Sequence, residues 1–422
     1  MITSYPRVGD KVIRSTLPGG LRVITVPKPG FKKKYAFIAF SYGGMDCIWE
    51  QDGKILTCPE GTAHYLEHRK FETKNGSADL LLAAVGAQAN AFTSEEMTAY
   101  LMECSDNFEQ SLEILLSFVS EDYFPSEGVE RERGIITQEI DMCFDDPWWC
   151  AGRALVEGLY SEHLLLNSTV GTRQSIAGVD ADVLRRCYES HYTLDNAVLC
   201  VVGDVEPERV EAIALEHLKL KAKGAKKLRS SEGGNSLTKK TELKLPVYNS
   251  IFEVGFKAEP TPLGTEHMKR GFLCELACES ILGGSSPLYS KLYADGLINS
   301  SFSVYGELAP GACYCAARGE SEYAEKVAEM ILDEVGRIAR EGFDEEHFAR
   351  QKKASFGARL RSLNSFENTA WDLCDGVFSN CDYFEFPQVY ESITAQEAAD
   401  FIKRTFTPER MCLVKVDPQK GE

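Results

Sequence analysis

The sequence is organised around the stretch Gly61-Thr-Ala-His-Tyr-Leu-Glu-His-Arg-Lys-Phe71. We predict a helix here, which places His64 and His68 four residues apart, one turn from each other on the same face. This spacing allows two imidazoles to bind a single Zn²⁺. Glu67, three residues after His64, is close enough to such a metal to act as a general base without being a ligand.

Two histidines alone hold zinc poorly, so the predicted site needs a third ligand. Residues 132–139, Glu-Arg-Gly-Ile-Ile-Thr-Gln-Glu, have the pattern of a helix that carries Glu132 and Glu139 seven residues apart on one face. This segment therefore supplies a candidate carboxylate. Two imidazoles and one carboxylate leave a fourth position on zinc open for water, which is typical of catalytic rather than structural zinc sites.

Four blocks of the sequence resemble the pitrilysin/insulinase metallopeptidases, whose His-x-x-Glu-His motif defines the inverzincins. Within that family the chain is most similar to the mitochondrial processing peptidase branch of half-length chains. The blocks cover most of residues 15–215 and are 61–71, 86–94, 132–146 and 191–204. The second half of the chain resembles the family only in outline.

The resemblance implies roles for the individual residues. The zinc ligands would be His64, His68 and Glu139, which follows His68 by 71 residues. Glu132 would orient a ligand histidine, and Glu67 would act as the general base in endopeptide hydrolysis. The implied α+β fold has two homologous α/β-sandwich domains, each with an antiparallel-rich sheet packed by helices, and forms half of a clamshell peptidase.

A substrate-binding strand is also implied by the resemblance. Residues 88–94 and 98–103 are predicted to be paired strands. In the family the strand that matches Ala89, Asn90, Ala91 and Phe92 lies at a sheet edge and hydrogen-bonds an extended substrate by β-augmentation. The alternative is an ordinary hairpin with Asn90 in a turn.

The sequence predicts an internal duplication. Tyr192-Thr-Leu-Asp-Asn precedes a strand at 197–202, as Phe406-Thr-Pro-Glu-Arg precedes a strand at 411–416. We expect a zinc-bearing domain over 1–220, a linker over 221–244 and a second homologous domain over 245–422. The linker is rich in Lys, Gly and Ser, and we interpret its basic run as solvated chain rather than as a nucleic-acid site. His-x-x-Glu-His is absent from the second half, so only the first domain would carry metal.

Local signals predict further elements. We expect a hairpin over 11–26, a central strand over 35–42, Thr62 as the N-cap of the zinc helix, and a helix over 77–85 ending at Gly86. Other helices are predicted at 107–120, 126–143, 150–160, 180–190, 206–218, 266–282, 286–294, 322–341 and 344–360. Other strands are predicted at 247–256, 300–307 and 313–317.

Composition narrows the functional classes. The chain has 422 residues, 44% of them apolar and 26% charged, which is typical of soluble globular proteins. Its net charge of −18 argues against a nucleic-acid partner. We see no apolar run long enough to span a membrane and no signal peptide at the N-terminus.

The 14 cysteines include no Cys-x-x-Cys pair. Cys274 and Cys278 are spaced for one helical face, and Cys313 and Cys315 for one strand face. We favour buried reduced thiols over a cysteine zinc site. With no signal peptide, these thiols predict a cytoplasmic protein.

One departure from the family concerns residues 288–302. There the family has an arginine and, seven residues later, a tyrosine that contact the substrate. Here Tyr293 lies near the arginine position, and Ser300 or Ser301 near the tyrosine position. We therefore expect a homologous zinc-free partner subunit to supply both groups in a heterodimer. The alternatives are a non-catalytic scaffold and a self-sufficient homodimeric peptidase.

Overall fold

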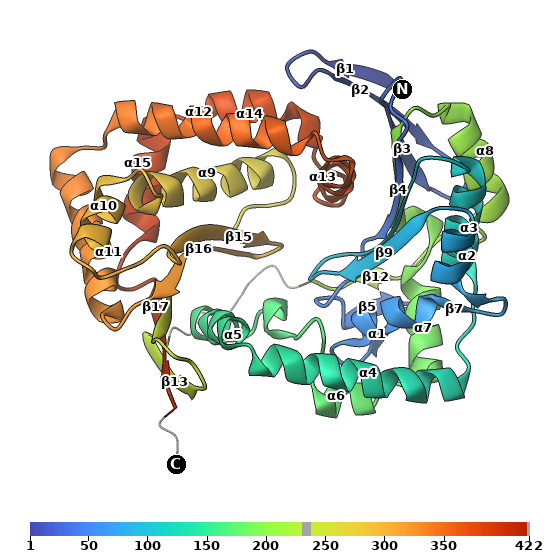
Figure 1. Ribbon diagram of the computed structural model, residues 1–422, viewed down its shortest axis with the longest axis horizontal. Helices are drawn as coiled ribbons and strands as arrows, with labels where there is room; N and C mark the ends of the chain where they lie inside the picture. The colour runs from blue at the N-terminus through green and yellow to red at the C-terminus, as the bar shows by residue number, and fades with distance from the viewer. Residues whose placement is uncertain (230–237, 420–422) are drawn as a thin grey trace. The chain divides into compact units, whose positions relative to one another are not determined.

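Figure 1 shows a computed structural model of the chain, which describes residues 1–229 and 238–419. By its internal contacts the chain forms two compact units, and each unit combines segments from both halves of the sequence. Unit 1 contains residues 1–141, 167–229 and 360–385, and unit 2 contains the described parts of 142–166, 230–359 and 386–422. No helix in the described ranges has the length and apolarity to cross a membrane.

Unit 1 is built on a seven-stranded sheet with the order β1-β2-β3-β11-β4-β10-β9. The predicted hairpin and the central strand are both confirmed, since β2 pairs with β3 and β4 lies between β11 and β10. Among the described residues, β3 and β11 are the only neighbours in this sheet that pair in parallel, and β9 lies at a free edge. The strands are β1 Ile2–Tyr5, β2 Asp10–Thr16, β3 Arg22–Pro27, β4 Lys34–Phe40, β9 Gln88–Thr93, β10 Thr98–Cys104 and β11 Ala197–Gly203.

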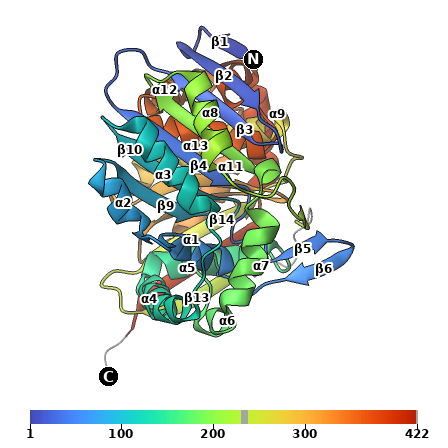
Figure 2. The same ribbon diagram turned by 90° about the vertical axis from the view of Figure 1, so that its right-hand side faces the viewer.

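Helices cover both faces of this sheet. One face carries the helices of the first half, and Figure 2 looks onto it with α1, α3, α7 and α8 in front of the strands. Its core includes Phe40, Leu66, Tyr100 and Leu112, all fully buried. The opposite face is covered by α13 Phe366–Phe378, which packs on β4 and β11 although it comes from the end of the chain. The first-half helices are α1 Thr62–Lys70, α2 Ala78–Ala84, α3 Phe108–Ser120, α4 Ser126–Asp145, α6 Arg173–Ala177, α7 Ala181–His191 and α8 Pro207–His217.

Short elements complete unit 1. A three-stranded ribbon has the order β12-β5-β6, and a two-stranded ribbon, β7-β8, follows α1. The bounds are β5 Ile48–Gln51, β6 Lys54–Thr57, β7 Glu72–Thr73, β8 Gly76–Ser77 and β12 Lys226–Lys227, with 3-10 turns at Leu194–Asn196 and Tyr383–Glu385.

Unit 2 repeats the strand arrangement of unit 1. Its sheet has the order β13-β17-β14-β16-β15, with β13 and β17 parallel and the other pairs antiparallel. This matches β3-β11-β4-β10-β9 position by position and sense by sense, as the predicted duplication requires. The strands are β13 Lys240–Leu245, β14 Ile251–Lys257, β15 Ser303–Ala309, β16 Ala312–Glu320 and β17 Met411–Pro418.

The helices of unit 2 also come from both halves of the sequence. α9 packs on β15 and β16, whereas α5 Pro147–Leu159 packs on β13, β14 and β17. The remaining bounds are α9 Thr265–Leu282, α10 Pro287–Ala294, α11 Ala324–Glu341, α12 Glu345–Ser362, α14 Phe386–Ser392 and α15 Ala395–Thr405, with a 3-10 turn at Leu164–Leu166.

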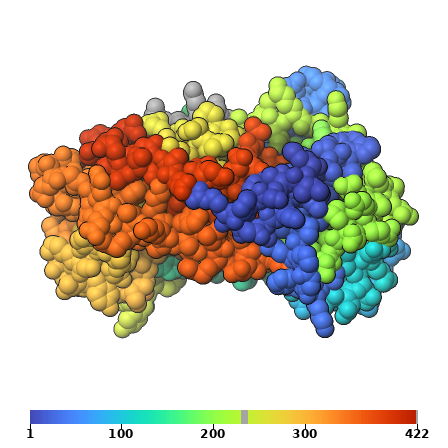
Figure 3. Space-filling view, turned by 90° about the horizontal axis from the view of Figure 1, so that it is seen from above, coloured from blue at the N-terminus to red at the C-terminus, as the bar shows by residue number. Residues whose placement is uncertain are grey.

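The compact units differ from the predicted contiguous domains 1–220 and 245–422 because two helices are exchanged. α5, from the first half, covers the sheet of unit 2, and α13, from the second half, covers the sheet of unit 1. A sheet buried on both faces needs a helix layer on each side, and the duplicated halves supply one another's second layer. The segment 360–385 also contacts the N-terminal hairpin, where Arg14 Nη2 lies 2.9 Å from Asp382 Oδ1. In Figure 3 the blue N-terminal residues lie beside orange residues from much later in the chain.

The predicted linker over 221–244 is structured at both ends. β12 pairs with β5, and β13 pairs with β17, so these parts are sheet rather than free chain. Between them, residues 230–237 lie outside the described residues. Lys227 and Arg229 bind inside unit 1, where Arg229 forms a bidentate ion pair with the fully buried Asp46. Two basic residues of the predicted solvated linker, Lys227 and Arg229, are therefore bound to unit 1 rather than solvated.

Candidate functional site

The N-cap of helix α1, which carries the two histidines, lies one residue earlier than predicted. Gly61 occupies the N-cap position with a left-handed φ of 82°, and Thr62 is the first helical residue. A Cβ on Gly61 would lie 2.7 Å from Gly171 Cα, so the tight approach of two backbones selects glycine here. Thr62 Oγ1 donates instead to the carbonyl of Pro59 at 2.6 Å. The prediction of Thr62 as the N-cap was wrong.

The structure brings His64, His68 and Glu139 together. Nε2 of His64 lies 3.4 Å from Glu139 Oε1, and Nε2 of His68 lies 3.5 Å from Glu139 Oε2. Zinc bonds of about 2.0–2.1 Å at tetrahedral angles place neighbouring ligand atoms about 3.4 Å apart, so the donor set fits Zn²⁺. Across residues 1–229 and 238–419, this is the one group of three potential ligands with metal-binding spacing. The hydrogen bond with His64 keeps the pKa of Glu139 low, which favours the ionised carboxylate.

Glu132 lies behind His68 and orients its ring. Nδ1 of His68 lies 3.0 Å from Glu132 Oε1 and donates to the carboxylate, which leaves Nε2 available on the side of Glu139. Burial lowers the pKa of His68, but Glu132 and the neighbouring carboxylates outweigh burial and raise it overall. Of the two glutamates on α4, Glu139 therefore faces both histidines, whereas Glu132 contacts the far side of the His68 ring.

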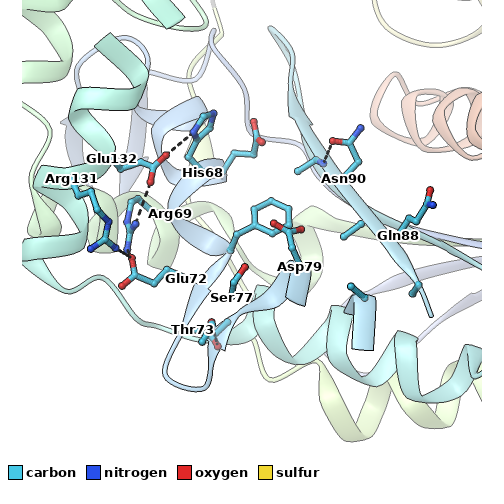
Figure 4. A pocket seen from close by; sticks show the side chains of 17 residues that line it. His68, Arg69, Glu72, Thr73, Ser77, Asp79, Gln88, Asn90, Arg131 and Glu132 are labelled. Carbon is cyan, nitrogen blue, oxygen red and sulfur yellow. Dashed lines mark hydrogen bonds and ion pairs between the residues drawn. The ribbon is translucent and has the colours of Figure 1, made fainter. Parts of the chain in front are cut away.

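Arg69 extends this support and was missed from the sequence. Its guanidinium is buried, pairs with Glu72 and lies 3.5 Å from Glu132 Oε2. Glu72 also accepts a hydrogen bond from Arg131 at 2.8 Å. The carboxylate that holds His68 is thus part of a paired network (Figure 4). The only sequence signal was an arginine directly after the motif, which by itself indicates no partner.

Glu67 lies beside the two histidines, with 7% of its surface exposed. Burial raises the pKa of its carboxyl, while the two imidazoles and a hydrogen bond from Thr93 oppose that rise. Thr93 Oγ1 donates to Glu67 Oε2 at 2.9 Å. A raised pKa brings this carboxyl closer to neutral pH, which suits a group that must accept and return a proton.

The predicted substrate strand lies at the sheet edge. Within residues 1–229 and 238–419, β9 pairs with a strand on one side only, which is β10. Asn90 is within β9 opposite Leu101 rather than in a turn. The turn alternative for Asn90 is therefore wrong. Because strand side chains alternate, Ala89 and Ala91 share the face of Thr93, which contacts Glu67. The free backbone edge of β9 consequently ends beside the candidate general base.

The second half places no arginine in the region that matches the family's substrate-contacting pair. Tyr293 lies on α10 with 53% of its surface exposed, and Ser300 and Ser301 follow in exposed turn residues. The four cysteines singled out in the sequence, Cys274, Cys278, Cys313 and Cys315, are buried free thiols. Cys274 Sγ lies 3.3 Å from Cys313 Sγ. They form no metal-binding group in the part of the chain that the structure describes.

Comparison with known proteins agrees with this geometry. Residues 58–173 match the family described as Insulinase (Peptidase family M16), and residues 178–355 match the Peptidase M16 inactive domain. The uncharacterized zinc protease YmfH of Bacillus subtilis is 33% identical, over 98% of both chains. This chain belongs to peptidase family M16. The candidate metal ligands and Glu67 lie within the first matched region, and residues 288–302 lie within the second.

Solved structures of the family share the fold. An M16-like peptidase from Alicyclobacillus acidocaldarius superposes with a TM-score of 0.92 at 26% identity, over 97% of this chain and 99% of that one. The periplasmic protease PqqL from Escherichia coli superposes with a TM-score of 0.74 at 18% identity, over 96% of this chain but only 47% of the PqqL chain. The present chain therefore has the fold of one half of a longer M16 protein.

Proposed function

We propose that this chain is the zinc-bearing subunit of an endopeptidase that hydrolyses peptides or unfolded segments. The observation that carries the proposal is the hydrogen bond between Glu67 and Thr93. It joins the candidate general base to the end of a free edge strand, beside three side chains with zinc-ligand spacing. Backbone recognition and hydrolytic chemistry are thus adjacent in unit 1.

Each residue has a defined task in this proposal. Zinc held by His64, His68 and Glu139 would polarise the scissile carbonyl and lower the pKa of the attacking water. Glu67 takes the proton of that water and returns it to the leaving amine. Glu132 holds the ring of His68, and the edge of β9 (residues 89–92 at its centre) hydrogen-bonds the peptide backbone in an extended form.

The second part of the proposal is a homologous, zinc-free partner. Residues 288–302 hold no arginine, and Ser300 and Ser301 cannot supply a phenol. The partner's arginine and tyrosine would stabilise the oxyanion that develops at the scissile carbonyl. Donors of this kind are each worth roughly 10²–10³ in rate. A chain without them would bind zinc and peptide but turn over slowly. The expected cytoplasmic location stays a prediction.

The proposal is tested by peptide hydrolysis with defined subunits. The zinc-loaded chain is assayed on quenched fluorescent peptides, alone at rising concentration and then with a homologous chain that lacks His-x-x-Glu-His. We expect weak activity alone and a rise of at least about a hundredfold with the partner. Full activity in the chain alone would instead support a self-sufficient homodimeric peptidase.

One observation favours a non-catalytic scaffold function instead. Residues 288–302 hold no arginine, and serine stands near the position where the family has a substrate-contacting tyrosine. The two readings differ in what they require of Glu67, because a scaffold has no need of a buried carboxylate beside the metal ligands. Zinc binding without hydrolysis, with every homologous partner added, would support the scaffold function.

A further inference from the structure

Arg229, which ends the first described range of the chain, inserts its side chain into unit 1. Its Nε and Nη2 donate to the carboxylate of Asp46 at 2.8 Å and 2.7 Å. The same Nη2 donates to the backbone carbonyl of Glu96 at 3.0 Å. The guanidinium therefore joins two loops, the 43–46 loop that follows β4 and the 94–97 loop that connects β9 to β10.

The two loops also approach each other through their backbones. The amide of Gly44 donates to the carbonyl of Ser94 at 2.9 Å, and the amide of Met45 donates to the carbonyl of Glu95 at 2.9 Å. A Cβ on Gly43 would lie 2.5 Å from the oxygen of Ser94, so this close approach requires glycine. Arg229 thus binds across a pair of loops that are already in backbone contact.

The charges around Arg229 show which of its bonds persists near neutral pH. Burial opposes ionisation of Asp46, but Arg229 outweighs burial and lowers the pKa of this carboxyl overall. Burial raises the pKa of Glu96 to about 7, so its carboxylate, 3.2 Å from Nη1 of Arg229, is a weaker partner near that pH. The bond to the Glu96 carbonyl does not titrate. The link between the loops consequently depends on the several donors of one guanidinium and not on charge alone.

The 94–97 loop connects Arg229 to the candidate general base. It directly follows Thr93, the last residue of β9, whose hydroxyl donates to Glu67. At the other end of the loop, Thr98 Oγ1 donates to the carbonyl of Tyr42 at 2.7 Å, next to the 43–46 loop. β9 has one neighbouring strand in the part of the chain that the structure describes, so the loop holds the end of β9 where a second strand does not. The position of Thr93 against Glu67 therefore depends on the contact between the two loops.

We propose that Arg229 is a positioning residue for peptide hydrolysis. By joining the 43–46 and 94–97 loops, it keeps Thr93 within hydrogen-bond distance of Glu67, and the carboxylate of Glu67 stays beside the two histidines. Among the described residues the hydrogen bonds of Arg229 go to Asp46 and Glu96, so its effect on Glu67 passes through the loop. The inference rests on the proposed peptidase function and adds to it a residue that lies outside the motif.

The first test uses Arg229→Lys in the full, zinc-loaded chain. Lysine keeps a positive charge opposite Asp46 but lacks the several donors that reach both loops, so the fold is retained while the link is weakened. Peptide hydrolysis is measured with the homologous partner present, and zinc content is measured on the same preparation. We expect kcat to fall about three- to tenfold and KM to stay within about twofold, because the centre of β9 is unchanged. Zinc content should equal that of the parent.

A double-mutant cycle separates positioning from a merely structural role. Thr93→Val removes the hydroxyl that contacts Glu67 and should lower kcat by itself. If Arg229 acts through Thr93, adding Arg229→Lys to Thr93→Val should lower kcat by at most about a further twofold. A residue that only stabilises the fold would lower kcat by the same factor in both backgrounds. That additive result, or a parental kcat in Arg229→Lys, would overturn the inference.

Arg209→Lys is the matched control. Arg209 also forms a bidentate pair with a carboxylate, that of Glu109, but its side chain is 57% exposed on α8. The control should keep the kcat of the parent.

Hydrogen exchange tests the loop contact without relying on hydrolysis. In Arg229→Lys the amides of Gly44 and Met45 should exchange about tenfold faster than in the parent, while the amides of β10 keep the parental rate. Parental exchange at Gly44 and Met45 would overturn the inference.

The outcome for the proposed function is distinguished by the parent chain. Hydrolysis by the parent with an additive effect of Arg229→Lys removes the positioning role and leaves the peptidase. A parent that cleaves no peptide with its partner removes the peptidase function and the role of Arg229 with it.

Discussion

Phe92 of β9 stacks on Trp371 of α13, with the ring centroids 4.4 Å apart and the ring planes inclined by 30°. Phe37 of the central strand β4 contacts the same ring of Phe92 at 5.8 Å. The edge strand β9, which has a neighbour on one side only in the part of the chain that the structure describes, is thus supported from the face opposite the candidate catalytic residues. This support comes from a helix encoded about 280 residues later, since 371 − 92 = 279.

Removing the contact between Phe92 and Trp371 should weaken peptide binding more than it slows the hydrolytic step. We expect Trp371→Ala to raise the KM for peptides about three- to tenfold, because an unsupported edge strand must be ordered when substrate pairs with it. Zinc content should remain that of the parent, and Trp371→Phe should restore most of the affinity. A fall in kcat with unchanged KM would contradict this role.

Zinc binding should depend on His68. We expect about one zinc per purified chain, and a large loss of zinc in His68→Ala because two donors hold the ion poorly. Metal analysis after dialysis measures the occupancy. His217→Ala, which changes a histidine at the end of α8, serves as the control. Unchanged zinc in His68→Ala would remove the proposed ligand set.

Glu67→Gln should separate metal binding from catalysis. The amide keeps the shape of the side chain and can still accept the hydrogen bond from Thr93, but it cannot take a proton. We expect parental zinc content and a loss of hydrolysis of at least about a hundredfold. A variant as active as the parent would show that Glu67 is not the base.

Glu132→Gln should have a milder effect on the metal. Its amide oxygen can still accept from His68 Nδ1, but the charge that polarises the ring and faces Arg69 is lost. We expect zinc affinity to fall roughly 10–100-fold, as titration against a competing chelator can measure. An affinity equal to that of the parent would leave Glu132 without a role at the metal.

Unit 2 should show a pH-dependent stability that originates from Glu253. Burial raises the pKa of this carboxyl to about 7, although Tyr305 donates to it at 3.0 Å and Arg318 lies 3.9 Å away. At pH values between the ordinary glutamate pKa and about 7, native Glu253 keeps its proton, whereas the same carboxyl in the unfolded chain has lost it. Stability therefore falls as the pH rises from the usual carboxyl range towards 7, by about 3 kcal/mol at most.

Glu253→Gln tests this directly. At pH 8 the variant should be more stable than the parent by about 1–3 kcal/mol, with little difference at pH 4.5, as judged by urea unfolding. Glu346→Gln is a control, because that side chain is 89% exposed. An equal effect of Glu253→Gln at both pH values would rule out titration of Glu253 as the cause.

The sequence by itself determined the elements that carry the site. Four-residue spacing on a helix places His64 and His68 on one face, and strand alternation places Ala89 and Ala91 together, because both periods are properties of the local backbone. The resemblance of residues 132–146 to a known family then distinguished Glu139 from Glu132, which spacing alone had left open. The parallel between residues 192–202 and 406–416 predicted the duplication, which the matching strand orders of the two sheets confirm.

Tertiary structure alone decided the rest. The pairing of Arg69 with Glu72 and Glu132 and the exchange of α5 and α13 join residues that no local period connects. Trp371 could not be assigned to β9 from the sequence, because an amphipathic helix specifies that one face must be buried but not which sheet buries it. Long-range packing selects that partner, and here it selected the sheet of the other half.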